Sequence, residues 1–323
     1  MSSSMLLQTE NLTKTYLRVS PITRKVRRVH AVKDINFSIP HNCIYGLIGE
    51  TGHGKSTFGR LALALETPTS GKVFFDGIEL TALSKNKLRK LRPKFQMVFQ
   101  SPDSALNPKQ RISEIIGYPL RFQMGYSRRQ VNWAVREMLE KVQLDIRYAE
   151  SYPRELSGGQ KQRVEIARAL SLGPKFLVAD EPASSLDASI RGRILNLLLK
   201  LKEEHSLTIL FIGHNLEVIE SICDTISVIY KGSIIETIAA DKIRFESRHP
   251  YTRALFGHFR LKTLNPEPSS AAKRKINAVE EETTGCRFSW QCPFVGDRCW
   301  KDFPELTKFN AGEVRCHFFE EIW

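Results

Sequence analysis

Hydrophobic and polar positions follow two different periods along the chain. Short apolar runs occur at residues 6–10, 35–39, 44–48, 176–180, 207–213 and 226–230. Runs of this length that are rich in Val, Ile and Phe predict buried β-strands. In residues 127–144 the apolar positions instead recur at helical spacing, at Val131, Val135, Met138, Leu139 and Val142. That spacing predicts an amphipathic helix with one buried face.

The order of these segments predicts an α/β architecture. Strands that alternate with helices favour a mostly parallel sheet covered on both faces, and a helical stretch over about 101–155 would then be an insertion. After residue 260 the periodic pattern fades. Residues 261–284 are rich in Pro, Ser and blocks of like charge, which predicts a linker. We therefore expect a main domain over 1–260 and a separate small module over 285–323.

Composition narrows the class of protein. An apolar share of 41% is typical of a packed chain, and 48 basic against 35 acidic residues give a net charge of +13. The basic residues gather at 18–28 and 85–94, which suits nucleic acid, a phosphate-rich ligand or an anionic membrane face, and a solvated surface is the alternative. No run approaches the ~18 apolar residues of a membrane span. We expect a chain that neither crosses a bilayer nor carries a secretory signal.

Residues 49–56, GETGHGKS, form a G-x-x-x-x-G-K-S phosphate loop between a predicted strand and a predicted helix. Glycines allow backbone N–H groups to surround phosphate oxygens, and the helix N-terminus adds positive charge. Lys55 is expected to reach the β- and γ-phosphates, and Ser56 to bind Mg²⁺. Asp180 and Glu181 end a buried strand at the same sheet edge. Asp180 suits Mg²⁺ binding, and Glu181 suits the polarisation of an attacking water.

A second anion-binding turn lies at residues 156–160, LSGGQ, just before a predicted helix. Its free N–H groups and the helix dipole would again favour a negative charge. A chain with one phosphate loop has no second phosphate group of its own to bind there. The second turn therefore suggests closure onto the nucleotide of another subunit.

In this combination the sequence resembles the ATP-binding subunits of ABC transporters over nearly its whole length. The matching motifs, in family order, are the Walker A loop at 49–56, the Q-loop at Gln100, the signature at 156–160, the Walker B strand at 176–180, the D-loop at 185–187 and the H-loop at His214. The resemblance implies a P-loop NTPase core with an antiparallel β subdomain and an inserted helical subdomain. A small cysteine-rich C-terminal module would complete the α/β fold.

The resemblance also implies roles for individual residues. Nucleotide binding would fall to Tyr16, Gly49, Glu50, Thr51, Gly52, His53, Gly54, Lys55, Ser56 and Thr57, with Tyr16 stacking on adenine. The signature residues acting in trans would be Ser157, Gly158, Gly159 and Gln160. Catalysis would fall to Glu181, His214 and Gln100, and Mg²⁺ binding to Ser56, Gln100 and Asp180. Asp187 would couple the two sites of a dimer.

Two features resemble the di- and oligopeptide importer branch of this family. One is RHPYTRAL at residues 248–255, and the other is a tail with Cys286, Cys292, Cys299 and Cys316. In that branch the tail can carry an iron–sulfur cluster, and four thiolates suffice for a 4Fe-4S cube. Zn²⁺ and unmetallated thiols remain alternatives, although the paired C-x2-C spacing typical of zinc sites is missing. Cys43 and Cys223 lie among apolar residues and are expected in the core.

The resemblance implies an ATPase that energises peptide import from the cytoplasmic face of a bacterial inner membrane. ATP would close a dimer and hydrolysis would open it. Its partners would be two transmembrane permease subunits, a second ABC ATPase that is a copy or a paralogue, and indirectly a substrate-binding protein, with no nucleic acid. Import of nickel or other metal chelates or of glutathione is an alternative. A soluble ABC ATPase acting on nucleic acid or ribosomes is another, and the tail could instead sense redox state.

Overall fold

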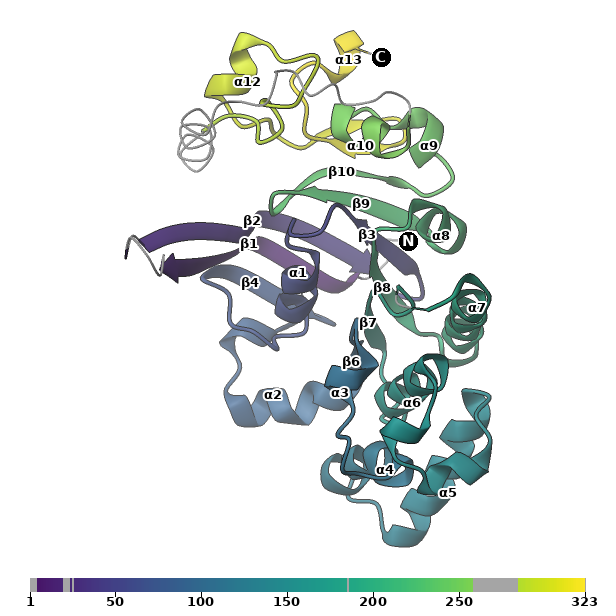
Figure 1. The fold of residues 1–323 in the computed structure, drawn as a ribbon. Coiled ribbons are helices and arrows are strands. Elements are labelled where there is room, and N and C mark those ends of the chain that lie inside the picture. Colours follow the sequence, from purple (N-terminus) through teal and green to yellow (C-terminus); the bar gives the residue numbers. More distant parts are fainter. Residues whose placement is uncertain (1–4, 20–23, 25, 185, 258–283, 323) are drawn as a thin grey trace.

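The computed structural model describes residues 5–19, 24, 26–184, 186–257 and 284–322. Two sheets lie at the centre of the molecule (Figure 1). The larger sheet has the strand order β11-β12-β10-β9-β3-β8-β7-β6, and the smaller has the order β2-β1-β4-β5. Neighbours among β3, β6, β7, β8 and β9 run parallel, whereas β10, β11 and β12 pair antiparallel. The structure therefore has the α/β core with an antiparallel β subdomain that the sequence predicts.

The parallel strands form the apolar centre of the core. They are β3 (Ile44–Ile48), β6 (Phe95–Val98), β7 (Phe176–Asp180), β8 (Thr208–Gly213) and β9 (Thr225–Tyr230). All residues of β3, β7 and β8 are buried, as expected for strands covered on both faces. Covering helices are α1 (Lys55–Ala62), α7 (Ala188–His205) and α8 (Leu216–Ile222). The predicted apolar runs in this region match the observed strands to within one residue at each end.

The smaller sheet extends further than its apolar pattern predicts. Strands β1 (Met5–Val19) and β2 (Val26–Pro40) pair along most of their length, and β4 (Ser70–Phe75) and β5 (Ile78–Glu79) complete the sheet. Leu17, Val19 and Val26 are 61–66% exposed where the two long strands extend past the core. Apolar periodicity reports burial, so it marked only the part of each strand that packs inward.

Helices form a separate lobe below β6 and β7 in Figure 1. They are α3 (Pro102–Ala105), α4 (Ile112–Gln123), α5 (Arg128–Lys141) and α6 (Gly158–Leu170). The helix α5 begins at the Ser127 cap, whose hydroxyl and Gln130 side chain satisfy backbone N–H groups reciprocally. Four of its five predicted core residues are buried, whereas Val131 packs at the edge. Helices α3, α4 and α5 lie within residues 101–155 and the signature helix α6 follows them, while the bounds of the insertion stay a prediction.

The described C-terminal segment, residues 284–322, packs onto the core and does not stand apart from it. Strand β12 (Gly312–Val314) pairs with β10 (Ser233–Ala239), and β11 (Thr307–Phe309) follows β12. Phe288 and Cys292 belong to the same hydrophobic cluster as the parallel strands. Phe288 and Val314 are therefore buried by this packing, whereas Phe294, Val295, Trp300 and Phe303 stay 36–39% exposed. The predicted linker lies almost wholly outside the described residues, so the domain boundaries stay a prediction.

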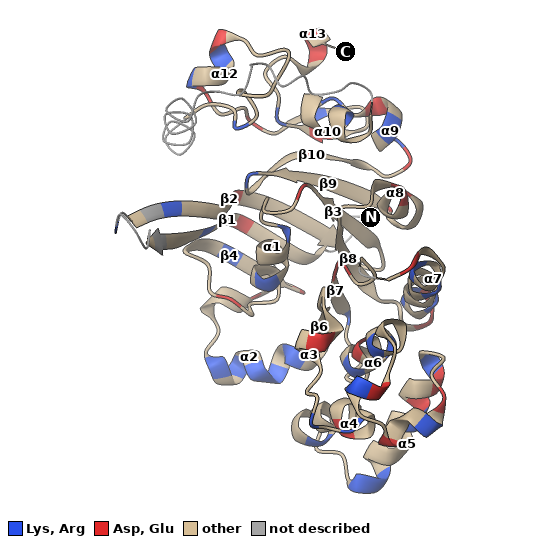
Figure 2. Cartoon of the chain, viewed as in Figure 1, with Lys and Arg blue, Asp and Glu red and all other residues tan. Residues whose placement is uncertain are grey.

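The short helices of the C-terminal part are α9 (Ile243–Glu246), α10 (Pro250–Leu255), α12 (Asp297–Lys301) and α13 (Phe319–Ile322). One of the two basic runs forms α2 (Lys85–Leu91), a largely exposed helix that is mostly blue in Figure 2. Part of the other run, at residues 20–23 and 25, lies outside the described residues. Within the described ranges, no helix combines the length and apolarity needed to span a membrane.

Candidate active site

A cavity of about 790 Å³ opens over the phosphate loop. It is lined by Thr51, Gly52, Gly54, Lys55, Ser56 and Thr57 from this loop and helix α1, by Tyr16 from β1, and by Gln100 and Glu181. These residues of the predicted site thus line one cavity, although they come from four distant parts of the sequence, whereas Gly49, Glu50, His53 and His214 do not line it. Parallel strands bring their carboxyl ends to one sheet edge, which explains the convergence.

Backbone geometry at Gly54 requires glycine. Its φ is +98°, and a Cβ atom would lie 1.9 Å from the carbonyl oxygen of Ala31. Gly54 is also the cap from which α1 begins, so the first N–H groups of α1 point into the loop. Lys55 is buried and its Nζ donates to the carbonyl oxygens of Gly49 and Glu50. Burial lowers the pKa of Lys55, against the attraction of the nearby carboxylates.

Ser56 and Asp180 form the candidate Mg²⁺ site. The Ser56 hydroxyl donates to Oδ1 of Asp180 at 3.1 Å. Burial raises the pKa of Asp180, the Ser56 bond lowers it, and the neighbouring Glu181 raises it further. A hydroxyl and a buried carboxylate are oxygen ligands of the kind that Mg²⁺ prefers, and a dication would relieve the repulsion between the two carboxylates. The pair therefore suits a hydrated Mg²⁺ beside bound phosphate.

Glu181 connects two loops that the sequence assigns to catalysis. Gln100 Nε2 donates to Glu181 Oε2 at 3.1 Å, and His214 Nδ1 lies 3.1 Å from the same oxygen. Glu181 itself has a φ of +48°, a left-handed conformation that is costly for a residue with a side chain. Its N–H donates to the carbonyl of Ile212, which holds the turn. The strained turn aims the carboxylate at Gln100 and His214 and away from the strand.

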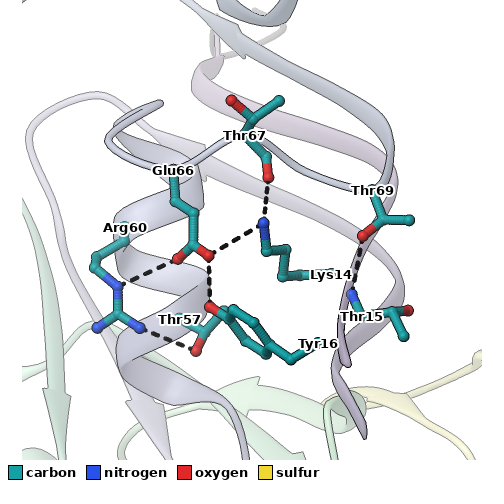
Figure 3. Close-up of polar contacts among 8 residues, drawn as sticks. All are labelled: Lys14, Thr15, Tyr16, Thr57, Arg60, Glu66, Thr67 and Thr69. Carbon is teal, nitrogen blue, oxygen red and sulfur yellow. Dashed lines mark hydrogen bonds and ion pairs between the residues drawn. The ribbon is translucent and has the colours of Figure 1, made fainter. Parts of the chain in front are cut away.

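Tyr16 is held by a carboxylate that the sequence analysis did not single out. Figure 3 shows its hydroxyl donating to Glu66 Oε1 at 2.6 Å, with Lys14 Nζ 3.1 Å from the same oxygen. Arg60 donates to Glu66 on one side and to the Thr57 hydroxyl on the other. Burial alone would raise the pKa of Glu66, but the bonds from Tyr16 and Lys14 outweigh it and lower the pKa. The network fixes the tyrosine ring beside the end of α1.

The phosphate loop is braced from the C-terminal side by Tyr251 of α10. The N–H of Glu50 donates to the Tyr251 hydroxyl at 3.2 Å, and this hydroxyl lies 3.3 Å from His53 Nδ1. His53 also packs edge-on against Tyr230, with ring centroids 4.7 Å apart. Burial, then Lys55, lowers the pKa of His53 to about 4. His53 is thus a neutral ring that packs among the aromatic rings of Tyr230 and Tyr251.

The signature residues lie on the helical lobe. Ser157 caps α6, where its hydroxyl accepts the N–H of Gln160 and the Gln160 side chain accepts the N–H of Ser157. Gly159 is buried, and a Cβ there would lie 2.6 Å from Ile190 of α7. None of the four signature residues lines the cavity over the phosphate loop. Asp187 begins α7, and Ser185 of the D-loop lies outside the described residues.

The cavity also has lining residues that the sequence analysis missed. They include Arg28, Lys33, Lys231, Arg287 and Trp290. Arg287 and Trp290 come from the C-terminal segment, so no motif near the phosphate loop indicates them. The excess of cations around the cavity suits a triphosphate.

The four C-terminal cysteines lie close enough to influence one another electrostatically. Burial raises the pKa of Cys286 and Cys316 to about 11 and of Cys292 to about 12, and other cysteines of the set add to each increase. The sulfurs of these three accept backbone N–H groups from Phe288, Phe294 and Phe318. Across the described residues, however, no three His, Cys, Asp or Glu side chains are grouped closely enough to hold a metal ion. Cys43 and Cys223 pack with the cores, as predicted.

Comparisons with known proteins agree with this geometry. The ABC transporter family matches residues 32–184, and the family described as oligopeptide/dipeptide transporter, C-terminal region, matches residues 235–299. A probable peptide ABC transporter ATP-binding protein of Sinorhizobium fredii is 39% identical, covering 98% of this chain and 90% of the relative. An oligopeptide transport ATP-binding protein of Bacillus subtilis is 38% identical over 94% of each chain.

A solved structure has the same fold as the core. The dimeric ATP-binding cassette MJ0796, in a post-hydrolysis state bound to ADP and phosphate, matches with a TM-score of 0.65 and 31% identity. The match covers 72% of this chain and 98% of the cassette. Identity of this level along almost the whole chain establishes the family. The chain belongs to the ATP-binding proteins of ABC transporters and is an ATPase whose C-terminal region is that of the oligopeptide/dipeptide transporters.

Proposed function

We propose that this protein energises the import of peptides across the bacterial inner membrane, bound to the cytoplasmic face of a permease. ATP binding closes a dimer of two ATPase subunits, and hydrolysis opens it. The relatives named above are peptide and oligopeptide transport proteins, which supports peptides as the cargo class.

One observation carries the proposal. The Glu181 carboxylate, the Gln100 amide and the His214 imidazole meet at 3.1 Å beside the cavity that Lys55 and Ser56 line. Phosphoryl transfer to water needs a positioned water, Mg²⁺ and cations around the dispersing charge. Glu181 polarises the water, and His214 and Gln100 hold the carboxylate. Ser56 and Asp180 would hold the Mg²⁺, which would neutralise charge on the phosphates.

The signature residues act on the nucleotide of the partner subunit. Within one chain they cap α6 and do not line the phosphate cavity. The capping box of Ser157 and Gln160 satisfies the backbone N–H groups of these two residues. Gly158, the first residue of α6, is exposed, so the N-terminus of the helix is open to solvent. An exposed helix N-terminus binds a phosphate group well. A head-to-tail dimer brings this end over the partner's Lys55, and Asp187 links the two sites.

A groove of about 530 Å³ between the core and the helical lobe suits the permease. It is lined in part by Leu65, Phe99 and Tyr118, and Phe99 directly precedes Gln100. Tyr118 and Phe122 of α4 are 55% and 57% exposed, with ring centroids 4.3 Å apart. Exposed aromatic pairs at the rim of a groove are typical of protein interfaces. Movement of the permease would thus reach Gln100 directly.

Reconstitution with the permease encoded by the neighbouring genes tests this function. We expect ATP turnover and uptake of di- to oligopeptides, both lost with Glu181→Gln. Tyr118→Ser should reduce the permease-dependent stimulation while basal turnover stays unchanged. Trp133→Ser, at a 67% exposed aromatic of α5 that does not line the groove, is the control.

Other outcomes would identify another function. Uptake of nickel chelates or glutathione without peptide uptake would keep the ATPase and replace the cargo. Salt-sensitive binding to DNA or RNA at physiological ionic strength, without stimulation by any permease, would favour the nucleic-acid class and overturn the proposal.

For the C-terminal cysteines we infer a 4Fe-4S cluster held by Cys286, Cys292, Cys299 and Cys316. Backbone N–H groups donate to three of the sulfurs, an arrangement that stabilises thiolates and tunes iron–sulfur clusters. A bound metal would also offset the cost of burying thiolates, whose pKa burial otherwise raises. The mutual influence of the four thiols supports one shared ligand.

Metal analysis of anaerobically purified protein tests this assignment. About four iron and four sulfide per chain are expected, with a visible charge-transfer band that disappears on replacing the four cysteines by serine. A measured content of one zinc per chain would instead show that the four cysteines bind Zn²⁺ and no cluster. If the protein contains neither iron nor zinc and the serine variant transports normally, these thiols have neither a structural nor a sensing role.

A further inference from the structure

The C-terminal segment reaches the nucleotide cavity from outside the ATPase motifs. Arg287 and Trp290 line the same cavity as Lys55, Ser56 and Tyr16. They lie more than 230 positions beyond the phosphate loop in the sequence, next to Cys286. Any effect of this segment on ATP would therefore act by direct contact.

The environment of Arg287 lacks a matching negative charge. Its guanidinium donates to the carbonyl of Lys231 and lies 5.8 Å from the ring centre of Phe303. Among the described residues it forms no ion pair, although Asp34 attracts it from a distance. Lys33 and Lys231 line the same cavity, so Arg287 stands among other cations there. A half-buried cation among cations is stabilised when an anion binds beside it.

Trp290 shows a second unmet interaction at the same cavity. Its indole Nε1 is buried and has no hydrogen-bond partner in the described part of the chain. The ring packs edge-on against Trp300, with centroids 4.9 Å apart, which fixes its orientation. A buried indole N–H normally finds an acceptor. A flat indole ring and a guanidinium that line one cavity together suit a nucleotide, whose base can stack on a ring and whose phosphates carry negative charge.

The same segment also contacts the phosphate loop through aromatic rings. Phe288 packs against Tyr230 and Tyr251, with ring centroids 5.4 and 5.5 Å apart. Both tyrosines contact His53 in the loop. Displacement of the segment would thus remove the Arg287 charge and the support of the loop together.

We propose that residues 286–290 form a wall of the ATP site in cis, in which Arg287 contacts phosphate oxygens and Trp290 contacts the nucleoside. ATP binding and docking of the cysteine segment then favour each other by the same factor, because coupling between two equilibria is reciprocal. The inference rests on the proposed ATPase function and goes beyond it. It makes the order of the cysteine segment a determinant of ATP affinity.

Nucleotide titration calorimetry with the full chain tests the inference. We expect Arg287→Gln to weaken MgATP binding about tenfold, the usual loss for one charge-assisted hydrogen bond. Arg298→Gln, at an exposed arginine of α12 in the same segment, is the matched control and should bind as the wild type does. Equal affinity of the Arg287 and Arg298 variants would overturn the inference.

Tryptophan emission gives an independent readout that does not depend on the arginine variant remaining folded. MgATP should change the emission of the wild type and of Trp133→Phe, and this change should be largely lost in Trp290→Phe. An unchanged signal in Trp290→Phe would contradict contact with the nucleoside. A wild type that binds no ATP at all would instead refute the proposed function, so the two failures are distinguishable.

Discussion

Oε2 of Glu181 and Nδ1 of His214 lie 3.1 Å apart, across the turn that ends β7 and the loop that follows β8. The same oxygen accepts the Gln100 amide. The Glu181 carboxylate thus contacts both the Gln100 loop and the His214 loop, and its orientation depends on the position of each loop.

Replacing Glu181 by Gln should abolish turnover while leaving nucleotide binding intact. The amide keeps the size of the side chain but cannot accept a proton from water, so we expect a loss of at least about 100-fold in ATP hydrolysis. Phosphate release and nucleotide titration measure the two properties separately. Glu217→Gln, at an exposed carboxylate of α8, should retain full activity. Near-normal turnover of the Glu181 variant would exclude it as the base.

Asp180→Asn should raise the Mg²⁺ concentration needed for half-maximal turnover by about tenfold. The amide oxygen can still accept the Ser56 hydroxyl, so the geometry of the pair is kept while the charge is removed. Turnover measured across a Mg²⁺ titration provides the readout. Asp241→Asn, at an exposed position, is the control. Identical Mg²⁺ dependence of both variants would show that Asp180 plays no part in holding the ion.

Tyr16→Phe and Glu66→Ala should weaken ATP binding by about threefold to tenfold each, since each removes the hydrogen bond that orients the Tyr16 ring. Because both changes disrupt the same bond, the double variant should be scarcely weaker than either single variant. Titration of the wild type, the two single variants and the double variant with ATP completes this double-mutant cycle. Strictly additive losses would mean that the bond does not orient the ring.

Glu165 should make the protein less stable as the pH rises. Its carboxylate is fully buried on α6 and accepts the N–H of Phe99, beside Gln100. Burial raises its pKa from 4.5 to about 7, despite the Phe99 bond and Arg168. The folded state therefore binds a proton that the unfolded state has released between these pH values, and stability falls across that window.

Glu165→Gln keeps the acceptor and removes the charge. Compared with this variant, the wild type should lose on the order of 2–3 kcal/mol of unfolding free energy between about pH 4.5 and pH 7. Denaturant unfolding at several pH values measures the difference, and other titrating groups cancel in the comparison. A difference that does not change with pH would refute a buried, titrating Glu165.

The motifs indicate the centre of the candidate site because each is contiguous in the sequence. Residues 49–56 specify their own loop, and Asp180 and Glu181 follow directly from a buried strand. Contacts between distant segments left no local signal. Glu66 is an ordinary acidic residue after a helix, and only the fold brings it within 2.6 Å of Tyr16.

The C-terminal part shows the same limit. Tyr251 lies within residues 248–255, which resemble the peptide importers, yet nothing in that segment indicates that its hydroxyl contacts the phosphate loop. The sequence predicts a separate module because the linker-like residues 261–284 precede the cysteines. In the structure, Phe288 instead packs in the hydrophobic core of the main domain, and β12 pairs with β10 of the large sheet.

The strand pairing of β12 with β10 has a consequence for solubility. A sheet that ended at β10 would present a row of free backbone donors and acceptors along a largely buried, apolar strand, which is a template for self-association. With β12 in place the sheet ends instead at β11, three residues long and bearing an exposed lysine. A chain shortened before residue 284 would therefore be expected to aggregate even where its phosphate loop is intact.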